Sequence, residues 1–508
     1  MTVAHAASLE GIDAHPVVVE ARVGKGLPGF DIVGLAERAV RESKVRVKSA
    51  LEALGRELPP AHFTINLAPG DVRKNGSALD LAIAVALLAA CDQVAAERLD
   101  GLLLIGELGL TGDLRTVRGV LPQLRAAPGW GMTRAVIPAG NAGEGALASG
   151  LDVRCASHLG ELLDWLDGKD DLPEPEPCSS SSGPAGAPVA DLSEVRGQEG
   201  AKRALEIAAA GGHHVLLVGP PGSGKTMLAR RLPGLLPPPD PGEALDIATV
   251  ASAAGLRPPG RLSAIERPFR APHHSASTAA LVGGGDPVRP GELTLSHGGV
   301  LFLDELPELR RDAIESLRIT MESGEAHIVR AKWRVRMPAE PLVVAAMNPC
   351  PCGYAGDPRR MCTCPGDRID RYRSRVSGPL MDRFDLHVSV PRVGTRALRK
   401  APRGDDSRRV RERVLAAREQ RARRAGAEQL EDLIASVHPS GLSLLERAVE
   451  RIGLTARGYV KVLRVARTIA DLEGAEKLSA AHVAEGVQYR LLDRGSPEQG
   501  RAQMGVMS

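Results

Sequence analysis

The sequence predicts an α/β protein in which a core with a parallel β-sheet stands between an N-terminal α/β domain and a C-terminal helical domain. Three observations predict this order. An apolar run, a glycine-rich turn and a helical pattern follow one another at residues 215–230, a second apolar run ends in two acids within 300–306, and helical periodicity returns after residue 440. The expected bounds are 1–168 for the N-terminal domain, 169–190 for a flexible linker, 191–393 for the core and 394–508 for the helical domain.

The composition limits the classes of protein to which the chain can belong. Its 508 residues leave room for about three domains, and a net charge of +3 neither requires nor excludes nucleic acid as a partner. Neither a membrane span nor a signal segment is visible, so we expect a cytoplasmic protein without a membrane partner. The seven cysteines do not indicate a disulfide framework in so long a chain.

The first 168 residues mix strand-like and helical patterns. The expected strands are Pro16–Val23, His62–Leu67, Leu102–Ile105 and Ala135–Pro138, and the expected helices are Ala36–Leu54 and Leu79–Cys91. From Gly168 to about Ala190 the chain fills with Pro, Gly, Ser and acidic residues. Such a composition cannot bury a core and is typical of a flexible linker.

The centre of the chain carries a phosphate-binding pattern. The apolar run Val215–Val218 precedes GPPGSGKT, and a helical pattern follows, which is the setting expected for G-x-x-x-x-G-K-[ST]. Its glycines let backbone N–H groups surround phosphates, and the helix adds its positive N-terminal end. We expect Lys225 to reach the β- and γ-phosphates of ATP and Thr226 to hold Mg²⁺. The expected nucleotide-binding residues are Gly219, Pro220, Pro221, Gly222, Ser223, Gly224, Lys225 and Thr226.

A second motif predicts hydrolysis as well as binding. VLFLDEL at Val300–Leu306 has the pattern of a buried parallel strand whose carboxyl end faces a ligand. We expect Asp304 to bind Mg²⁺ and Glu305 to polarise the attacking water. The position of this strand after the phosphate-binding loop fits the order of motifs in P-loop NTPases.

Two insertions lie on either side of that strand. The first, about residues 251–297, holds a glycine triplet with His273 and His274, and it predicts a mobile loop in which the histidines are polar loop residues rather than metal ligands. The second, EAHIVRAKWRVRMPAEP, alternates on both sides of a two-residue turn, as a hairpin does. Lys332 can pair with phosphate and Trp333 can stack on a base, so both are candidate DNA contacts. A structural hairpin with Trp333 packed inward is the alternative.

Four cysteines lie close together after the predicted strand Leu342–Met347. NPCPCGYAGDPRRMCTCPGD spaces them as C-x-C, nine residues and C-x-C, so that four thiolates can surround a tetrahedral Zn²⁺. Free thiols are the alternative. The expected zinc ligands are Cys350, Cys352, Cys362 and Cys364.

The region after Leu398 is predominantly helical. In the arginine run RRVRERVLAAREQRARR, Glu and Ala stand at helical spacing, which favours a solvated helix over a DNA-facing stripe. Three amphipathic helices follow in SLLERAVERIG, LTARGYVKVLRVARTIADLEG and SAAHVAEGVQYRLL, with Thr455 and Ser479 as expected N-caps.

With these motifs in this order, the core resembles AAA+ ATPases, and VRGQEGAKRALEIAA looks like the helix on the adenine side of their nucleotide site. The resemblance implies that Asn348 is sensor 1, whose amide holds the hydrolytic water. It implies that Arg383 in MDRFD is an arginine finger that reaches the nucleotide of a neighbouring subunit; a surface ion pair is the alternative. It also implies that the helical domain is a lid over ATP, with Arg457 as sensor 2 and Arg464 as the second choice.

The N-terminal domain resembles the proteolytic domain of Lon-type proteases through GSALDLAIAVALLAA and GELGLTGDLRTVRGVLPQLRAA. Its catalytic positions differ. Ala78 takes the place of the nucleophile, with Ser77 one residue earlier, and Leu121 takes the place of the general-base lysine. A serine–lysine mechanism needs a hydroxyl and an amine within hydrogen-bond reach, so we expect a protease-like fold without protease activity.

Over nearly the whole chain, a Lon-like domain, an AAA+ core with MNPCPCG and a helical lid resemble the YifB family of magnesium-chelatase-like AAA+ ATPases. The resemblance implies a homo-hexameric ATPase that moves on branched or single-stranded DNA and drives branch migration in recombination or natural transformation. Two alternatives stay open: an ATPase subunit of the magnesium-chelatase type, and a protein-remodelling ATPase. DNA-stimulated ATP hydrolysis would separate the DNA motor from both.

Overall fold

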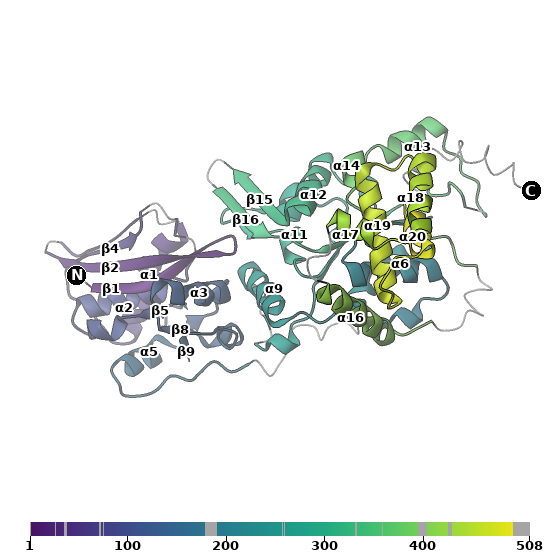
Figure 1. Ribbon diagram of the computed structural model, residues 1–508. Helices are drawn as coiled ribbons and strands as arrows, with labels where there is room; N and C mark the ends of the chain where they lie inside the picture. Colours follow the sequence, from purple (N-terminus) through teal and green to yellow (C-terminus); the bar gives the residue numbers. More distant parts are fainter. Residues whose placement is uncertain are drawn as a thin grey trace, which may run out of the picture.

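The computed structural model describes residues 2–25, 27–34, 38–70, 73–74, 76–177, 190–256, 258, 260–330, 333–357, 359–394, 404–424 and 429–490. Figure 1 shows an N-terminal body in purple and blue, a central body in teal, and helices in green and yellow that cover the far side of the central body. No helix in the described ranges is long and apolar enough to cross a lipid bilayer.

A seven-stranded mixed sheet forms the N-terminal domain, in the strand order β3-β4-β2-β1-β5-β8-β9. All four strands and both helices predicted from the sequence are present. The strands are β1 (Thr2–Glu10), β2 (Asp13–Gly24), β3 (Gly29–Val33), β4 (His62–Ala68), β5 (Leu102–Leu104), β8 (Arg134–Pro138) and β9 (Asp152–Ala156), beside the small ribbon β6 (Glu107–Leu108) and β7 (Leu114–Arg115). The helices are α1 (Arg38–Ala53), α2 (Asp80–Ala90), α3 (Val120–Ala126), α4 (Ala142–Gly145) and α5 (Leu159–Leu166).

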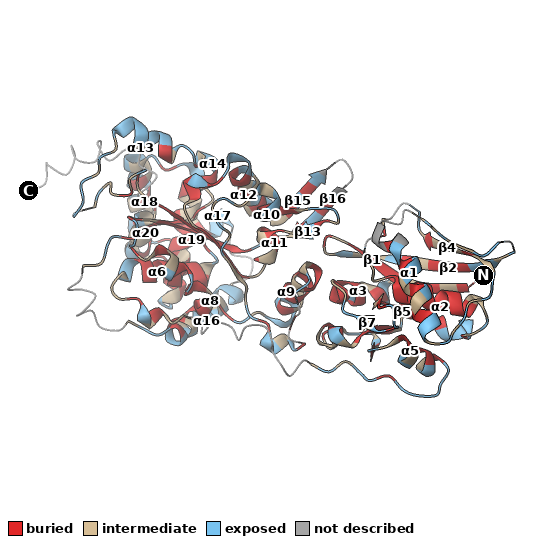
Figure 2. Ribbon diagram, turned by 180° about the vertical axis from the view of Figure 1, so that it is seen from behind, coloured by how far each residue is buried: buried red, intermediate tan, exposed pale blue. Residues whose placement is uncertain are grey.

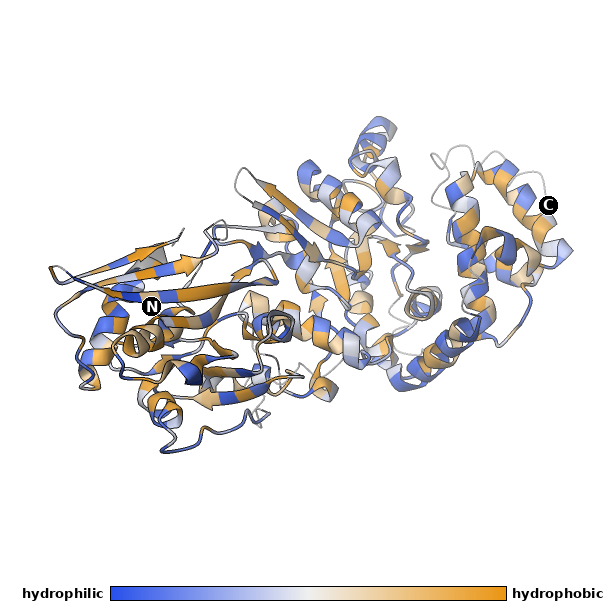
Figure 3. Ribbon diagram, turned by 60° about the vertical axis from the view of Figure 1, so that its left-hand side comes forward, coloured by the Kyte–Doolittle hydropathy of each residue, from blue (hydrophilic) through white to orange (hydrophobic). Residues whose placement is uncertain are grey.

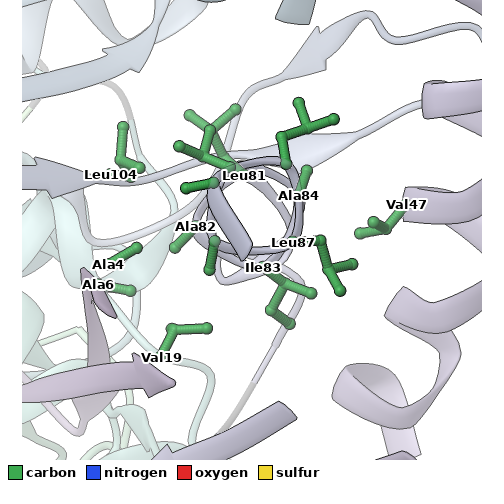
Figure 4. Packing of buried hydrophobic residues seen from close by; sticks show 14 of the residues in the cluster. Ala4, Ala6, Val19, Val47, Leu81, Ala82, Ile83, Ala84, Leu87 and Leu104 are labelled. Carbon is green, nitrogen blue, oxygen red and sulfur yellow. The ribbon is translucent and has the colours of Figure 1, made fainter. Parts of the chain in front are cut away.

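Helix α2 is the centre of the core of this domain. It is buried from Asp80 to Ala89, as expected for a helix that is apolar on every side. Figure 4 shows α2 end-on, with Val19 of the sheet on one side and Val47 of α1 on the other. Its buried acid, Asp80, accepts hydrogen bonds from Arg46, whose Nε lies 2.5 Å from Oδ2, and from the Ser43 hydroxyl.

The first part of the predicted linker packs on the N-terminal domain. The Cys155 N–H donates to Pro173 O at 2.9 Å, and the Leu172 side chain is buried. β9 is an edge strand, and a proline- and acid-rich segment can lie along such an edge while burying a single leucine. Leu172 and Pro173 of the predicted linker therefore contact the N-terminal domain, and residues 178–189 lie outside the described part of the chain.

The core is built on a five-stranded parallel sheet in the order β11-β14-β17-β10-β18. Figure 2 shows these strands as mostly buried. The strands are β10 (Val215–Val218), β11 (Phe269–Arg270), β14 (Val300–Leu303), β17 (Leu342–Met347) and β18 (Leu386–Ser389). The helices are α6 (Glu199–Gly211), α7 (Lys225–Ala229), α8 (Leu232–Leu235), α9 (Pro241–Ala254), α10 (Thr278–Val282), α11 (Glu292–Leu295), α12 (Arg311–Ser323), α13 (Gly366–Arg373) and α14 (Gly378–Met381).

The first insertion, which the sequence predicts to be a mobile loop, combines loops with several short regular elements. It contains α10, α11 and the small hairpin β12 (Gly283–Gly284) and β13 (Arg289–Pro290). Leu281, Val288 and Leu293 share a buried cluster with Ile328 of the second insertion. The glycines allow one tight hairpin, and the apolar residues around them anchor the rest of the insertion.

The second insertion is the predicted hairpin. β15 (Glu325–Arg330) and β16 (Trp333–Pro338) pair antiparallel, with Arg330 opposite Trp333. This pairing is the one that the alternation predicts, and residues 331–332 lie outside the described part of the chain. Both candidate DNA contacts fall outside what the structure describes: Lys332 entirely, and Trp333 in its side chain.

The N-terminal domain contacts the core mainly through α9, which lies between the two bodies in Figures 1 and 2. Leu121 of α3 packs with Ile247 of α9, and Leu121 N–H donates to Ser252 Oγ at 3.2 Å. The Ser252 hydroxyl donates to the carboxylate of Glu144, and burial raises the pKa of this carboxyl group. The domain also reaches the hairpin, because Ile12 in the β1–β2 turn packs against the cluster that contains Val335.

The C-terminal domain consists of α16 (Ser407–Arg423), α17 (Leu430–Ala435), α18 (Pro439–Ile452), α19 (Ala456–Leu472) and α20 (Ala480–Gln488). Both predicted N-caps are confirmed: Thr455 accepts from Gly458 N–H, and Ser479 accepts from His482 N–H. Figure 3 shows hydrophilic residues along α16. Several arginines of α16 attach it to the core: Arg413 pairs with Glu206 at 2.5 Å, and Arg418 donates to Ala209 O at 2.8 Å.

Candidate nucleotide site

Three neighbouring strands bring the predicted nucleotide-handling residues together. β17 lies between β10 and β14, so Asn348, which follows β17, stands between the phosphate-binding loop and the acidic pair. Lys225 Nζ donates to Asn348 Oδ1 at 3.2 Å, and Thr226 Oγ1 donates to Asp304 Oδ2 at 3.1 Å. These contacts join residues 123 and 78 positions apart in the chain.

The phosphate-binding loop has the backbone geometry that a phosphate cradle needs. Gly222 and Gly224 have φ values of +75° and +96°, which side chains rarely adopt. Apart from Gly222 itself and its two chain neighbours, no atom of the described residues lies within 4 Å of where a Cβ of Gly222 would stand, so the space above this turn is open to a ligand. The loop residues therefore fit a nucleotide, and the oxygens of Thr226 and Asp304 fit the ligand preference of Mg²⁺.

The Lys225 ammonium is buried beside the loop. It donates to Gly219 O at 2.7 Å and to Pro220 O at 3.1 Å, in addition to Asn348. Burial lowers the pKa of Lys225, and the charges of Asp304 and Glu305 oppose this change. A cation in this environment is favourably placed to bind phosphate groups.

The Glu305 carboxylate contacts a histidine side chain, and the sequence did not indicate this contact. Its Oε2 lies 3.0 Å from Nδ1 of His274, and the rings of His273 and His274 are in tilted contact, with centroids 4.1 Å apart. His274 follows β11, which pairs with β14, so the topology places the two side chains together. His274 is a polar loop residue, as the sequence predicts, and its contact with Glu305 is the part that the sequence did not indicate. β11 is two residues long, which is too short to be predicted from periodicity.

Arg383 lies in an ion pair within its own chain. Its Nη2 is 2.8 Å from Glu322 Oε2, and the two side chains are 25% and 50% exposed. Such an exposed pair contributes about 0–1 kcal/mol, so a phosphate group can replace Glu322 at little cost. Arg457 and Arg464 are exposed on α19, and neither borders the cavity beside the phosphate-binding loop. The assignment of either residue as sensor 2 stays a prediction.

A cavity of about 470 Å³ opens beside the phosphate-binding loop. The sequence did not single out Arg359 or Arg392 on its wall. Gln198, from the segment that resembles the adenine-side helix, donates to Ser223 O at 3.1 Å and to Pro391 O at 2.6 Å. The lining residues are Glu194, Arg196, Gln198, Pro221, Gly222, Ser223, Gly224, Met227, Arg359, Arg392 and Val393.

The four clustered cysteines converge on one point. All four sulfur atoms lie within 4.8 Å of one another, and Cys350 Sγ is 3.3 Å from Cys352 Sγ and 3.6 Å from Cys362 Sγ. Thiolates bound at about 2.3 Å to a tetrahedral ion lie about 3.8 Å apart, so this arrangement needs only small shifts to hold a metal. Burial raises the pKa of the Cys352 thiol, but hydrogen bonds from the backbone of Thr363 and Tyr354 and from neighbouring thiols outweigh burial and lower this pKa to about 6.

The residues aligned with a serine–lysine dyad do not form one. Ala78 is partly buried and packs against a core cluster, and Leu121 is fully buried in the contact with α9. The Ser77 hydroxyl donates to the carboxylate of Glu107. The absence of protease activity in the N-terminal domain stays a prediction.

Family models match most of the chain. The description "Magnesium chelatase, subunit ChlI" matches residues 191–398, "Subunit ChlI of Mg-chelatase" matches residues 19–141, and "Magnesium chelatase, subunit ChlI C-terminal" matches residues 404–490. The three matches follow the order of the domains described above.

Full-length relatives show the same order. The chain is 42% identical to the uncharacterized protein YifB of Salmonella typhimurium over 502 residues, which cover 97% of this chain and 98% of the relative. It is 42% identical to YifB of Escherichia coli, with 97% and 98% covered. It is also 42% identical to the competence protein ComM of Haemophilus influenzae, with 95% and 96% covered. The chain therefore belongs to the YifB family of magnesium-chelatase-like AAA+ ATPases.

Proposed function

We propose that this chain is an ATP-driven DNA helicase or translocase that acts on branched or single-stranded DNA and drives branch migration. The observation that carries the proposal is the connection between hairpin β15–β16 and the nucleotide site. β16 ends at Pro338, β17 begins at Leu342, and the residue after β17 is Asn348, 3.2 Å from Lys225. A shift of β17 during hydrolysis would therefore move the hairpin and its candidate DNA contacts, Lys332 and Trp333.

The nucleotide site supplies the groups that phosphoryl transfer to water needs. Lys225 and the loop N–H groups bind the phosphates, and Asn348 orients the attacking water. Mg²⁺, held by Thr226 and Asp304, would neutralise charge on the β- and γ-phosphates. Glu305 accepts a hydrogen bond from the water and polarises it, which requires its carboxylate to leave His274.

The proposed assembly is a homo-hexamer with Arg383 as the arginine finger. The Arg383 guanidinium forms an exposed ion pair with Glu322, and the γ-phosphate of the neighbouring subunit's nucleotide can displace Glu322 from it. In a closed ring, the hairpins of all subunits would point to a common channel, where DNA would pass. The similarity to a competence protein supports natural transformation as the setting.

We also propose that the cysteine cluster holds one Zn²⁺ per chain. The four sulfur atoms already surround a single point, and thiolates are ligands that Zn²⁺ prefers. Metal analysis of protein purified without chelator should find about one zinc per chain, and Cys350→Ser with Cys362→Ser should lose it. Protein without zinc would contradict the assignment.

DNA-stimulated ATP hydrolysis tests the proposed function. We expect forked DNA to raise the turnover of the full-length chain, with little turnover in Glu305→Gln, which should still bind ATP. Stimulation should weaken as salt rises, because the contacts are made to phosphates. ATP turnover that is indifferent to DNA but responds to unfolded protein or to a porphyrin would instead indicate a remodelling or chelatase-type ATPase.

A further inference from the structure

The cysteine loop, residues 350–364 with the exception of residue 358, lies directly against the phosphate-binding loop. A Cβ at Gly353 would stand 2.6 Å from Pro221 Cδ, and Gly353 has a φ of +84°. A side chain there would push the two loops apart. Cys350 is fully buried and follows Asn348 by two residues. The cysteine loop therefore shares a packed surface with the nucleotide site.

Asp357 ties this loop to the wall of the cavity. Its side chain is 1% exposed, and Oδ1 accepts from the N–H groups of Arg359 at 2.8 Å and Arg360 at 3.3 Å. Its Oδ2 lies 3.3 Å from Nε of Arg392, at ion-pair distance but outside hydrogen-bond geometry. Arg392 also donates to Pro221 O at 3.1 Å. One buried carboxylate thus links the cysteine loop, the chain after β18 and the phosphate-binding loop.

The cavity beside the phosphate-binding loop carries excess positive charge. Arg196, Arg359 and Arg392 border it, and the lining has one acid, Glu194, which already pairs with Arg231 at 2.6 Å. Within the described residues, no ion pair engages the Arg359 guanidinium. A cationic wall of this kind is suited to an anionic or aromatic ligand.

The position of the cavity indicates which part of a nucleotide it receives. Its lining includes Gln198 and Met227 but none of Asp304, Glu305 and Asn348. The latter three surround the place of the γ-phosphate. The cavity is therefore at the base, ribose and α-phosphate end of the nucleotide.

We propose that Arg359 is a nucleotide-binding residue and that the metal-bound cysteine cluster is its support. The proposal rests on the proposed ATPase function. Nine residues separate Cys352 from Cys362, and their sulfur atoms are 3.6 Å apart, so a metal at this point closes a short loop that contains Arg359. Closure restricts the loop and pre-organises the guanidinium for the nucleotide. Metal binding and nucleotide affinity are thereby linked.

The test measures binding of fluorescent ADP and ATP derivatives to the full-length chain. Arg359→Ala should weaken both by the same factor, about tenfold or more, because the lost charge-assisted contact does not involve the γ-phosphate. Arg360→Ala is the matched control: its guanidinium stacks on Tyr354 at 4.1 Å and does not border the cavity, so affinity should stay within about twofold of wild type.

The cluster is tested in the same assay. Cys362→Ser should reproduce the loss seen in Arg359→Ala, the double variant should lose little more, and Cys91→Ser, outside the cluster, should bind normally. A zinc-selective chelator added to the wild type checks the result without a substitution. Normal affinity in Arg359→Ala would overturn the inference, and normal affinity in both Cys362→Ser and chelated protein would overturn the role of the cluster. A wild type that binds neither nucleotide would contradict the proposed ATPase function itself.

Discussion

Replacing His274 with alanine should raise the basal rate of ATP hydrolysis. Nδ1 of His274 lies 3.0 Å from Oε2 of Glu305, and the side chains are 37% and 45% exposed. A contact so accessible to water typically contributes about 0.2–1 kcal/mol. Glu305 must give up this contact before it can polarise water, so removing it lowers the barrier by that amount. The expected increase in kcat is about 1.4- to 5-fold.

The assay is steady-state ATP turnover at saturating ATP without DNA. His274→Asn retains a side-chain N–H donor and should stay close to wild type, and so should His273→Ala, whose Nδ1 contacts Ser275 rather than Glu305. The increase should disappear when His274→Ala is combined with Glu305→Gln. A basal rate in His274→Ala equal to or below that of wild type would show that the contact does not restrain Glu305.

Three further outcomes are expected. Lys225→Ala should abolish or greatly weaken ATP binding, measured by nucleotide fluorescence, because the charge that faces the β- and γ-phosphates is lost; wild-type affinity would contradict its role. Incubation with unfolded protein and ATP should yield no fragments on a gel, and cleavage that Ser77→Ala abolishes would show that the domain is a protease after all. Stability should fall from pH 7 to pH 5, because burial lowers the pKa of His213 to about 4 and that of His387 to about 3. Histidines in the unfolded chain have a pKa near 6.5, so at pH 5 they are protonated while the two native histidines stay neutral. The two residues together lower the free energy of unfolding by on the order of 4 kcal/mol at pH 5. Denaturant unfolding at both pH values measures this loss, and equal stabilities would refute it.

Periodicity predicted the elements of the fold better than the contacts between them. The helix at Leu79–Cys91 and the antiparallel pairing of β15 with β16 follow from local patterns, and both are present. The bond between Ser252 and Glu144 joins residues 108 positions apart, and no local pattern indicates it. The packing of Leu172 on the N-terminal domain was missed for the same reason.

The residues of the candidate site also fall into two groups, those that local motifs predicted and those that they did not. The phosphate-binding loop and Asp304 stand in motifs whose spacing reflects their chemistry, and the structure places Thr226 beside Asp304. The contacts of His274, Arg359 and Arg392 depend on which strands are neighbours and on a buried carboxylate, neither of which the spacing reveals. The arginine run of α16 was ambiguous, because composition does not distinguish arginines that bind core carbonyls from arginines that face DNA.

The most direct test of a DNA motor is ATP-driven branch migration of a three-stranded or four-way DNA junction by the full-length chain. We expect junction conversion with ATP, none in Glu305→Gln, and a large loss in Lys332→Ala with basal ATP turnover retained. Junction conversion by Lys332→Ala at the wild-type rate would show that the essential DNA contact lies elsewhere in the chain. A wild-type chain that hydrolyses ATP but leaves every junction unchanged would contradict the proposed function.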